Sequence, residues 1–439
     1  MKRIKYSISI TTPFMVLVLM LFSSCGKNST HKKNNDTESK KIMTAKDILG
    51  DPNYLAMSYG GYRNKNHDIE PTIDELKDDM KILFAMGVRI VRTYKVHLPQ
   101  AANLLKAISE LKKEDNDFEM YVMLGAWIDC KNAWTDIAPD HDTESEMNKP
   151  QIEEAVRLVN KHPDIVKIIA VGNEAMVKWA ESYYVQPEVI LKWVNHLQEL
   201  KKSNKLPKDL WVTSSDDFAS WGGGGGEYHT KDLEKLYHAV DYISMHTYPY
   251  HNTHYNPEFW GVPENEEELT EIQKIDAAMF RARDFAKNQF NNVTNYMKSI
   301  GIDKPIHIGE TGWATTSNGY YGPKGSKATD EYKEGLYYKL MREWTNANSI
   351  SCFYFEAFNE PWKDAHNKNG SENHFGLFTT DGQAKYALWN LVDDGIFNGL
   401  TREGNAISKT YNGDTDAMMK NVLVPPTAKQ ISANREGNK

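Results

Sequence analysis

Two glutamates directly follow apolar, strand-like segments in distant parts of the sequence. The segment Ile165–Val171 is rich in β-branched residues, and the turn Gly172–Asn173 leads from it to Glu174. The segment Lys304–Gly309 ends in the same way at Glu310. A carboxylate at the end of an apolar strand is costly to bury without a partner, so it needs a functional or structural reason. The repeated pattern predicts two carboxylates that face one site.

A pair of carboxyl groups among many aromatic rings suits the cleavage of glycosidic bonds. One carboxylic acid protonates the leaving oxygen, and a second carboxylate attacks the anomeric carbon or activates water. The chain has 11 Trp and 23 Tyr, and such rings stack on sugar faces, although most are expected in the core. Each glutamate taken alone would more often be solvated or ion-paired. The hypothesis therefore depends on the two together.

The elements that position these residues alternate along the chain. Strands are expected at 54–59, 89–94, 119–127, 165–171, 210–215, 241–248, 305–309 and 350–358. Helical periodicity is found at 72–86, 151–161, 188–201, 233–239, 271–300 and 330–346. This alternation predicts an α/β protein, a (β/α)8 TIM barrel in a single catalytic domain over residues 43–405. In such barrels the carboxyl ends of the strands converge on the active site.

Three other segments interrupt the alternation. The run Gly222–Gly226 is expected to form a flexible loop, without the residue order of a phosphate-binding loop. The stretch Pro249–Glu268 is long, aromatic and acidic and contains Trp260, so it is expected to be functional or disordered. Residues 406–439 show little periodicity and are expected to form a partly ordered C-terminal extension.

The amino terminus resembles a targeting segment. Residues 1–25 combine a basic start, a short apolar centre and a small-residue exit, typical of a secretory signal peptide. Cys25 after two serines resembles a bacterial lipoprotein processing site, which would make it the lipidated first residue of the mature protein. Residues 26–42 are expected to form a flexible polar linker. The lipidated protein is expected at the bacterial cell envelope, at the outer membrane. The alternative interpretation of residues 1–25 is an ordinary cleaved signal, which leaves Cys25 without a lipid.

The remaining composition narrows the class of partner. A net charge of −8 with mixed signs argues against nucleic acid. Three cysteines cannot form a disulfide framework. Histidines at 246, 251, 254 and 307 lack the spacing of a metal site, so we expect no metal and no cofactor.

Five motifs together resemble glycoside hydrolase family 17, the β-1,3-glucanases and their relatives. They are Val171–Glu174, Thr247–Tyr250, Gly309–Trp313, Phe358–Lys363 and Glu372–Phe378. The resemblance extends over about residues 54–400, in the family's order. It implies a retaining mechanism on a (β/α)8 barrel, with Glu174 as general acid and base and Glu310 as nucleophile. In retaining pairs the carboxyls lie roughly 5–5.5 Å apart, so one anion raises the pKa of its partner.

Ten residues at strand ends or within these motifs are predicted to bind substrate. They are Asn173, Tyr59, Tyr94, Trp127, Tyr248, Trp313, Glu360, Lys363, Glu372 and Phe375. Asn173 is placed to bind the hydroxyl next to the anomeric carbon, and Tyr248 could orient Glu310. Glu360, Lys363 and Glu372 resemble the family's charged cluster; a buried salt-bridge network is an equally good interpretation.

The sequence therefore predicts an endo-acting β-1,3-glucan hydrolase of the laminarin type, with β-glucan polysaccharide or oligosaccharide as its partner. One alternative is a β-1,3-glucanosyltransferase, in which a sugar hydroxyl replaces water. Another is a non-catalytic glycan-binding surface lipoprotein, which would need neither glutamate. The choice between pure β-1,3 and mixed β-1,3/1,4 chains is left open.

Overall fold

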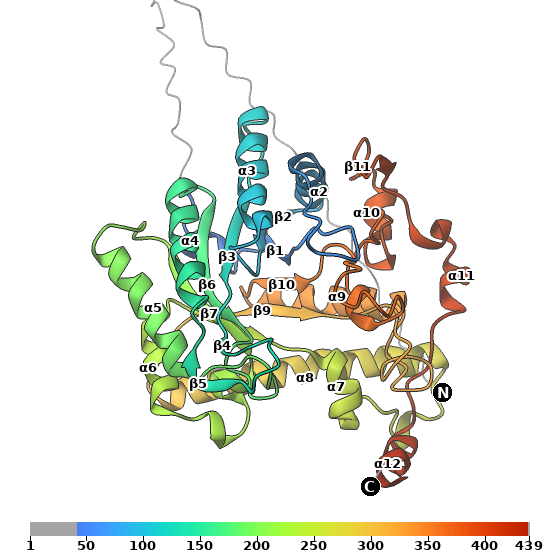
Figure 1. Cartoon of the computed structure of the whole chain (residues 1–439). Helices are drawn as coiled ribbons and strands as arrows, with labels where there is room; N and C mark the ends of the chain where they lie inside the picture. Colours follow the sequence, from blue (N-terminus) through green and yellow to red (C-terminus); the bar gives the residue numbers. More distant parts are fainter. Residues whose placement is uncertain (1–41, 438–439) are drawn as a thin grey trace, which may run out of the picture. The chain divides into compact units, whose positions relative to one another are not determined.

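Eight parallel strands form a closed barrel in the computed structural model, which describes residues 42–437 (Figure 1). Their spatial order is β1-β10-β9-β8-β7-β6-β3-β2. The strands are β1 (Leu55–Ser58), β2 (Val88–Arg92), β3 (Tyr121–Ala126), β6 (Val166–Asn173), β7 (Trp211–Asp217), β8 (Ile243–His246), β9 (Ile306–Gly312) and β10 (Cys352–Phe355). The predicted TIM barrel is confirmed. The predicted signal peptide, with Cys25, lies outside the described residues.

The barrel strands are buried because helices cover their outer face and side chains fill the interior. Strand β6, which leads to Glu174, is buried from Val166 to Gly172. It pairs with β3 and β7 in parallel register, with Ala170 opposite both Gly125 and Thr213. This two-sided pairing fixes where the strand ends and therefore where the glutamate projects.

The helices surround the strands (Figure 1). They are α1 (Ala45–Ile48), α2 (Ile73–Ala85), α3 (Pro99–Glu114), α4 (Asn148–Lys161), α5 (Pro187–Lys202), α6 (Lys231–Ala239), α7 (Pro249–Tyr255), α8 (Glu271–Ser299), α9 (Glu331–Ala347), α10 (Trp389–Asp393), α11 (Thr415–Met419) and α12 (Ala428–Gly437). Helix α2 starts with a capping box between Thr72 and Glu75. Helix α3 was not predicted; its N-cap residue Leu98 makes no side-chain cap.

The glycine run is more ordered than expected. A π-helical turn spans Ala219–Gly223, and Gly222 adopts φ +78°. A Cβ on Gly222 would lie 2.1 Å from the Tyr296 ring, so this glycine permits close packing against α8. The prediction of a flexible loop is therefore wrong for the buried glycines 222 and 223, whereas 224–226 are exposed.

The stretch after β8 is also structured. It contains α7 and two short 3-10 turns, Pro257–Phe259 and Glu264–Glu266. Trp260 is fully buried, and its indole N–H donates to the carbonyl of Ser326 at 2.7 Å. Trp260 therefore anchors this stretch to the loop after β9 instead of facing solvent.

Two hairpins and a C-terminal segment complete the described chain. Hairpin β4 (Cys130–Lys131) and β5 (Asp140–Glu144) follows β3, and hairpin β11 (Thr401–Arg402) and β12 (Asn405–Ala406) precedes the C-terminal helices. A parallel bridge between Val262 and Thr427 joins the C-terminal segment to the loop after β8. Within residues 42–437, no helix has the length and apolarity that crossing a bilayer requires.

Candidate active site

Glu310 lies on β9 and is held by three donors. Its side chain accepts hydrogen bonds from Arg92 at 2.7 Å and the Tyr94 hydroxyl at 2.8 Å, both to Oε2. The Tyr248 hydroxyl donates to Oε1 at 2.6 Å. Glu310 is only 7% exposed, so these donors replace water around the carboxylate. The hydrogen bond from Tyr248 agrees with its predicted role in orienting Glu310. Tyr94 makes the corresponding hydrogen bond to the other carboxylate oxygen.

This environment favours the ionised form of Glu310. Burial alone would raise the pKa of the carboxyl, but His246, Arg92 and the hydrogen bonds from Tyr248 and Tyr94 together lower the pKa below its ordinary value. Arg92 is the permanent cation among them, because burial lowers the pKa of His246 to about 4 and its ring is neutral at neutral pH. Glu310 is therefore an anion over the physiological range.

Glu174 follows β6 in a left-handed turn, with φ +47°. Its backbone N–H donates to the carbonyl of Ser215 on β7 at 2.9 Å, which fixes the turn. Within the described residues, its carboxyl has one polar contact, between Oε1 and Nδ1 of His246 at 3.1 Å. Burial and the charge of Glu310 raise the pKa of Glu174 to about 8, although Arg92 opposes them. Glu174 is therefore a protonated acid at neutral pH.

Arg92 connects Glu310 to the rest of the site. This buried guanidinium also donates to the carbonyl of Gly309 at 2.8 Å and to the side-chain oxygen of Asn173. The amide nitrogen of Asn173 makes no hydrogen bond among the described residues and remains available to a sugar hydroxyl. Arg92 was not predicted, although a charged residue that ends the strand Val88–Arg92 is a signal of the same kind as the glutamates.

His246 contacts both sides of the site. Its Nε2 lies 2.8 Å from the Ser215 hydroxyl and 3.3 Å from Nη1 of Arg92. Arg92 can only donate to Nε2, whereas the Ser215 hydroxyl can donate or accept, so the contact with Arg92 favours the neutral tautomer with its proton on Nδ1. Nδ1–H then donates to Oε1 of Glu174. This leaves the acidic proton of Glu174 on Oε2, the oxygen without a protein partner among the described residues.

The predicted charged cluster is compact and largely buried. Lys363 donates to Glu356 at 2.8 Å and lies 3.8 Å from Glu360. Glu360 also accepts from the indole N–H of Trp362 at 2.9 Å. Burial raises the pKa of Glu372, and the charge of Glu310 raises it further, whereas Lys363 lowers it. Glu372 is therefore within electrostatic reach of the predicted nucleophile. Glu356 was not predicted as part of this cluster.

The structure brings some predicted aromatic residues to the site and leaves others in the core. Tyr59 is 1% exposed and donates to Asp79 at 2.8 Å, and Trp313 is fully buried and donates to the carbonyl of Ala328. Phe375 is also buried and packs beneath Tyr248. These three rings support the barrel, which corrects the prediction that they bind sugar. Ring type alone does not reveal burial.

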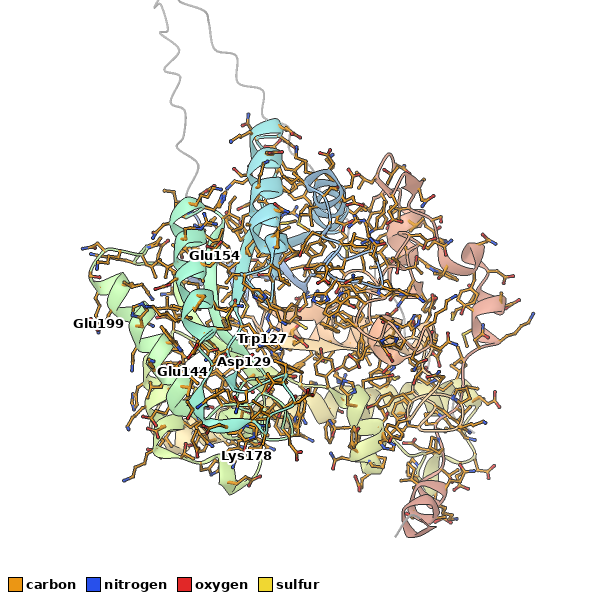
Figure 2. All side chains as sticks on the ribbon, in the orientation of Figure 1. Trp127, Asp129, Glu144, Glu154, Lys178 and Glu199 are labelled. Carbon is orange, nitrogen blue, oxygen red and sulfur yellow. The ribbon has the colours of Figure 1, made fainter. Side chains whose placement is uncertain are left out.

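Trp127 is half-buried just beyond β3, and its indole N–H donates to Asp129 at 3.2 Å. Both residues lie close to the β4–β5 hairpin (Figure 2). Among residues 42–437, no three His, Cys, Asp or Glu side chains are grouped to hold a metal ion.

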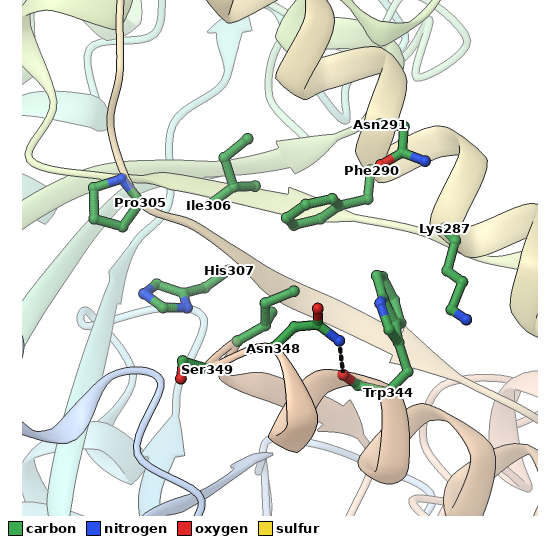
Figure 3. Close-up of a pocket in the computed structure, with 10 residues that line it drawn as sticks. Lys287, Phe290, Asn291, Pro305, Ile306, His307, Trp344, Asn348 and Ser349 are labelled. Atoms are coloured by element: carbon green, nitrogen blue, oxygen red, sulfur yellow. Dashed lines mark hydrogen bonds between the residues drawn. The ribbon is translucent and has the colours of Figure 1, made fainter.

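A separate pocket lies between α8 and α9 (Figure 3). Its lining includes Phe290, Pro305, His307 and Trp344. Pro305 precedes β9, so the pocket lies at the amino end of that strand, whereas Glu310 lies toward the carboxyl end. It therefore does not belong to the carboxylate site.

The chain matches the BtgE/BtgC glycoside hydrolase domain over residues 56–376. The crystal structure of an endo-laminarinase from Formosa Hel1_33_131 is 66% identical and covers 88% of this chain and 98% of its own, with a TM-score of 0.87. A β-1,3-glucanosyltransferase from Rhizomucor miehei, solved with laminaritriose, shares the fold at 20% identity and a TM-score of 0.51, covering 76% of this chain and 96% of its own.

Curated fungal relatives agree with this match. A "Glucan 1,3-beta-glucosidase" of Arthroderma benhamiae is 24% identical over 71% of this chain and 83% of its own length. A "Probable glucan endo-1,3-beta-glucosidase btgC" of Aspergillus terreus is 24% identical over 81% of this chain, which spans only 48% of that relative. Since the family match includes nearly the whole barrel and both glutamates, the chain belongs to the BtgE/BtgC glycoside hydrolase domain family.

Proposed function

We propose that this protein is a retaining, endo-acting β-1,3-glucan hydrolase that cleaves laminarin-type chains. The observation that carries the proposal is the opposite protonation of two carboxyls in one site. The pKa of Glu174 is raised to about 8, whereas that of Glu310 is lowered. One acid and one anion at the same pH are what a double displacement requires. The name of the 66% identical endo-laminarinase supports the choice of substrate.

In the first step, a carboxylate oxygen of Glu310 attacks the anomeric carbon. Glu174 gives its Oε2 proton to the glycosidic oxygen as the bond between that oxygen and the anomeric carbon breaks. The reducing-end part of the chain leaves as an alcohol, and the remaining sugar is bound to Glu310 as an ester. The ester carries no charge, so the Coulombic contribution that raised the pKa of Glu174 disappears.

In the second step, the ionised Glu174 acts as a base. It takes a proton from water, whose oxygen attacks the anomeric carbon and releases Glu310 as a carboxylate. Two inversions give net retention of configuration. Asn173 is placed to bind the hydroxyl beside the anomeric carbon through its amide nitrogen, while Arg92 fixes the amide oxygen. Glu360, Lys363 and Glu372 would bind hydroxyls of the neighbouring sugars.

Transfer to a sugar hydroxyl would use the same two glutamates. The relative named as a glucanosyltransferase shares only the fold, whereas the 66% identical relative is named as an endo-laminarinase, which favours water as the acceptor. A purely glycan-binding role would need neither the raised pKa nor the lowered one.

Product analysis tests the proposal. With linear laminarin, early size distributions should contain oligosaccharides of intermediate length, and the new reducing ends should appear first as the β-anomer by proton NMR. Chains longer than an oligosaccharide substrate would indicate transfer instead. Absence of any new reducing ends across β-1,3 and mixed-linkage glucans would reject the enzymatic proposal.

We also propose that residues 1–25 are a lipoprotein signal, that Cys25 is lipidated and that residues 26–42 tether the barrel domain to the outer membrane. The support is the sequence pattern Ser23-Ser24-Cys25 after a short apolar segment. Expression in a bacterium fed labelled palmitate should label the wild-type protein but not Cys25→Ser. Equal labelling of both proteins would reject lipidation at Cys25.

A further inference from the structure

Three aromatic rings form one cluster beyond the carboxyl ends of β3 and β6. Trp134 stacks on Tyr183 with ring centroids 4.8 Å apart and an interplanar angle of 20°. Trp127 lies 5.6 Å from Tyr183 and 6.4 Å from Trp134. We call these three residues the aromatic platform. Only Trp127 was singled out from the sequence.

The aromatic platform is held by backbone contacts. The N–H of Cys130, in the β4–β5 hairpin, donates to the carbonyl of Tyr183 at 3.1 Å. The backbone of Asp129 is bound on both sides by the Asn148 side chain, at 3.1 and 2.9 Å. The carboxyl of Asp129 in turn accepts from the indole of Trp127. The rings are therefore preorganised, which lowers the entropic cost of binding a ligand.

Trp134 is poorly explained as a core residue. Trp134 is 60% exposed, and its backbone adopts φ +62°, a rare conformation for a bulky residue. Because one indole face is covered by Tyr183, the exposed area includes surface on which a flat apolar ligand can stack. β-Linked glucose rings present such faces, with C–H groups on each side and hydroxyls around the edge.

The aromatic platform lies on the acid's side of the site. Tyr183 belongs to the segment that connects Glu174 to α5, and Trp127 follows β3, the strand that pairs with β6. Burial raises the pKa of the Tyr183 hydroxyl, and the charges of Glu174, Asp216 and Glu310 raise it further, so this ring is within electrostatic reach of both glutamates. The donors to Glu310, in contrast, come from β2 and from the residues after β2 and β8.

We propose that the aromatic platform forms a binding subsite for the leaving, reducing-end part of the glucan chain, in which the exposed Trp134 is the stacking surface and the buried Tyr183 ring supports it from behind. The inference rests on the proposed function, in which Glu174 protonates the oxygen of the leaving part. That part must therefore extend past Glu174. One charged group borders the rings and can bind sugar hydroxyls: Lys95, whose Nζ is 4.3 Å from the Trp127 ring centroid.

The test compares two substrates that differ in the leaving part. Laminarihexaose fills subsites on both sides of the scissile bond, whereas a 2,4-dinitrophenyl β-laminaribioside has no sugar on the leaving side. Trp134→Ala should lower kcat/KM for laminarihexaose about tenfold, the contribution of one aromatic stack, and leave kcat/KM for the aryl substrate unchanged. Trp134→Phe should recover part of the loss, because a ring is restored.

Tyr411→Ala is the matched control. Tyr411 is also an exposed aromatic residue with a positive φ of +52°, but it lies in the C-terminal segment. Tyr411→Ala should leave kcat/KM unchanged for both substrates. Unchanged hydrolysis of laminarihexaose by Trp134→Ala, or an equal loss on both substrates, would overturn the subsite.

Binding measurements distinguish a failure of this inference from a failure of the proposed function. If the wild-type protein cleaves no glucan, the proposed function fails, and calorimetry with laminarihexaose decides the subsite. Weaker binding by Trp134→Ala than by wild type would then support a glycan subsite, and equal affinity would reject it.

Discussion

Nδ1 of His246 lies 3.1 Å from Oε1 of Glu174, while Nε2 of the same ring faces Arg92. Arg92 also donates to Glu310. The neutral imidazole of His246 therefore lies between the predicted acid, Glu174, and the guanidinium that holds the predicted nucleophile. This arrangement keeps the two carboxyls in different protonation states without a shared hydrogen bond. It also leaves one oxygen of Glu174 unoccupied by the protein groups described.

The first prediction is a pH profile of kcat/KM on laminarin with two limbs. The rate should fall as pH rises through about 8, because Glu174 then loses the proton that the leaving oxygen needs. It should fall on the acid side only below the ordinary glutamate value of 4.5, because the lowered pKa keeps Glu310 ionised until then. A basic limb near pH 5 would contradict the assignment of Glu174 as the buried acid.

Replacing Glu174 by Gln removes the acidic proton but keeps a side chain of nearly the same size that can still form hydrogen bonds. Hydrolysis of laminarin should fall by about 10²–10⁴-fold, the usual range for general acid catalysis. A dinitrophenyl glycoside, whose leaving group needs no proton, should lose far less in the first step. Equal losses on both substrates would contradict the acid role.

Replacing Glu310 by Ala removes the nucleophile. Turnover should fall by about 10⁴-fold or more, while binding of laminarihexaose measured by calorimetry should persist. Azide added with an activated aryl glycoside should restore product formation by occupying the space of the lost carboxylate. Its attack opposite the leaving group would give the α-glycosyl azide. A β-azide, or undiminished hydrolysis without azide, would show that another residue is the nucleophile.

Tyr248→Phe removes one donor from Glu310. The hydroxyl lies 2.6 Å from Oε1 and helps to lower the pKa of the carboxyl, so the acid limb should move to higher pH. A hydrogen bond to a charged group contributes about 1.5–3 kcal/mol, which corresponds to about 10- to 150-fold in kcat/KM if it acts in the transition state. Tyr354→Phe is the control, because that buried hydroxyl has no hydrogen-bond partner among the described residues. An unmoved acid limb in Tyr248→Phe would contradict the role of this tyrosine.

Much of the barrel could be predicted from the sequence because its strands are buried on both faces and read as continuous apolar segments. The observed β6 and β9 overlap the predicted segments; β6 runs on to Asn173, and β9 includes Glu310 and ends at Gly312. Helix α3 starts at Pro99 without a polar cap and was missed, although Pro at the first helical position is itself a helix-start signal.

The site was predicted only where a residue type was itself unusual. A glutamate after an apolar strand stands out, whereas Arg92 and His246 act through partners from other strands that only the closed barrel brings together. The aromatic residues show the opposite limit. Trp313 and Trp134 are the same residue type, yet one is fully buried and the other is 60% exposed, because tertiary packing decides which rings reach the surface.

In the proposed mechanism, Glu310 becomes covalently bound to the sugar and Glu174 does not. A 2-deoxy-2-fluoro β-laminaribioside with a dinitrophenyl leaving group should form the glycosyl-enzyme and then stall, because the fluorine slows its hydrolysis. Peptide mass spectrometry of the inactivated protein should locate one fluorosugar on Glu310, with release of one equivalent of dinitrophenol. A label on Glu174 or on any other residue would show that Glu310 is not the nucleophile.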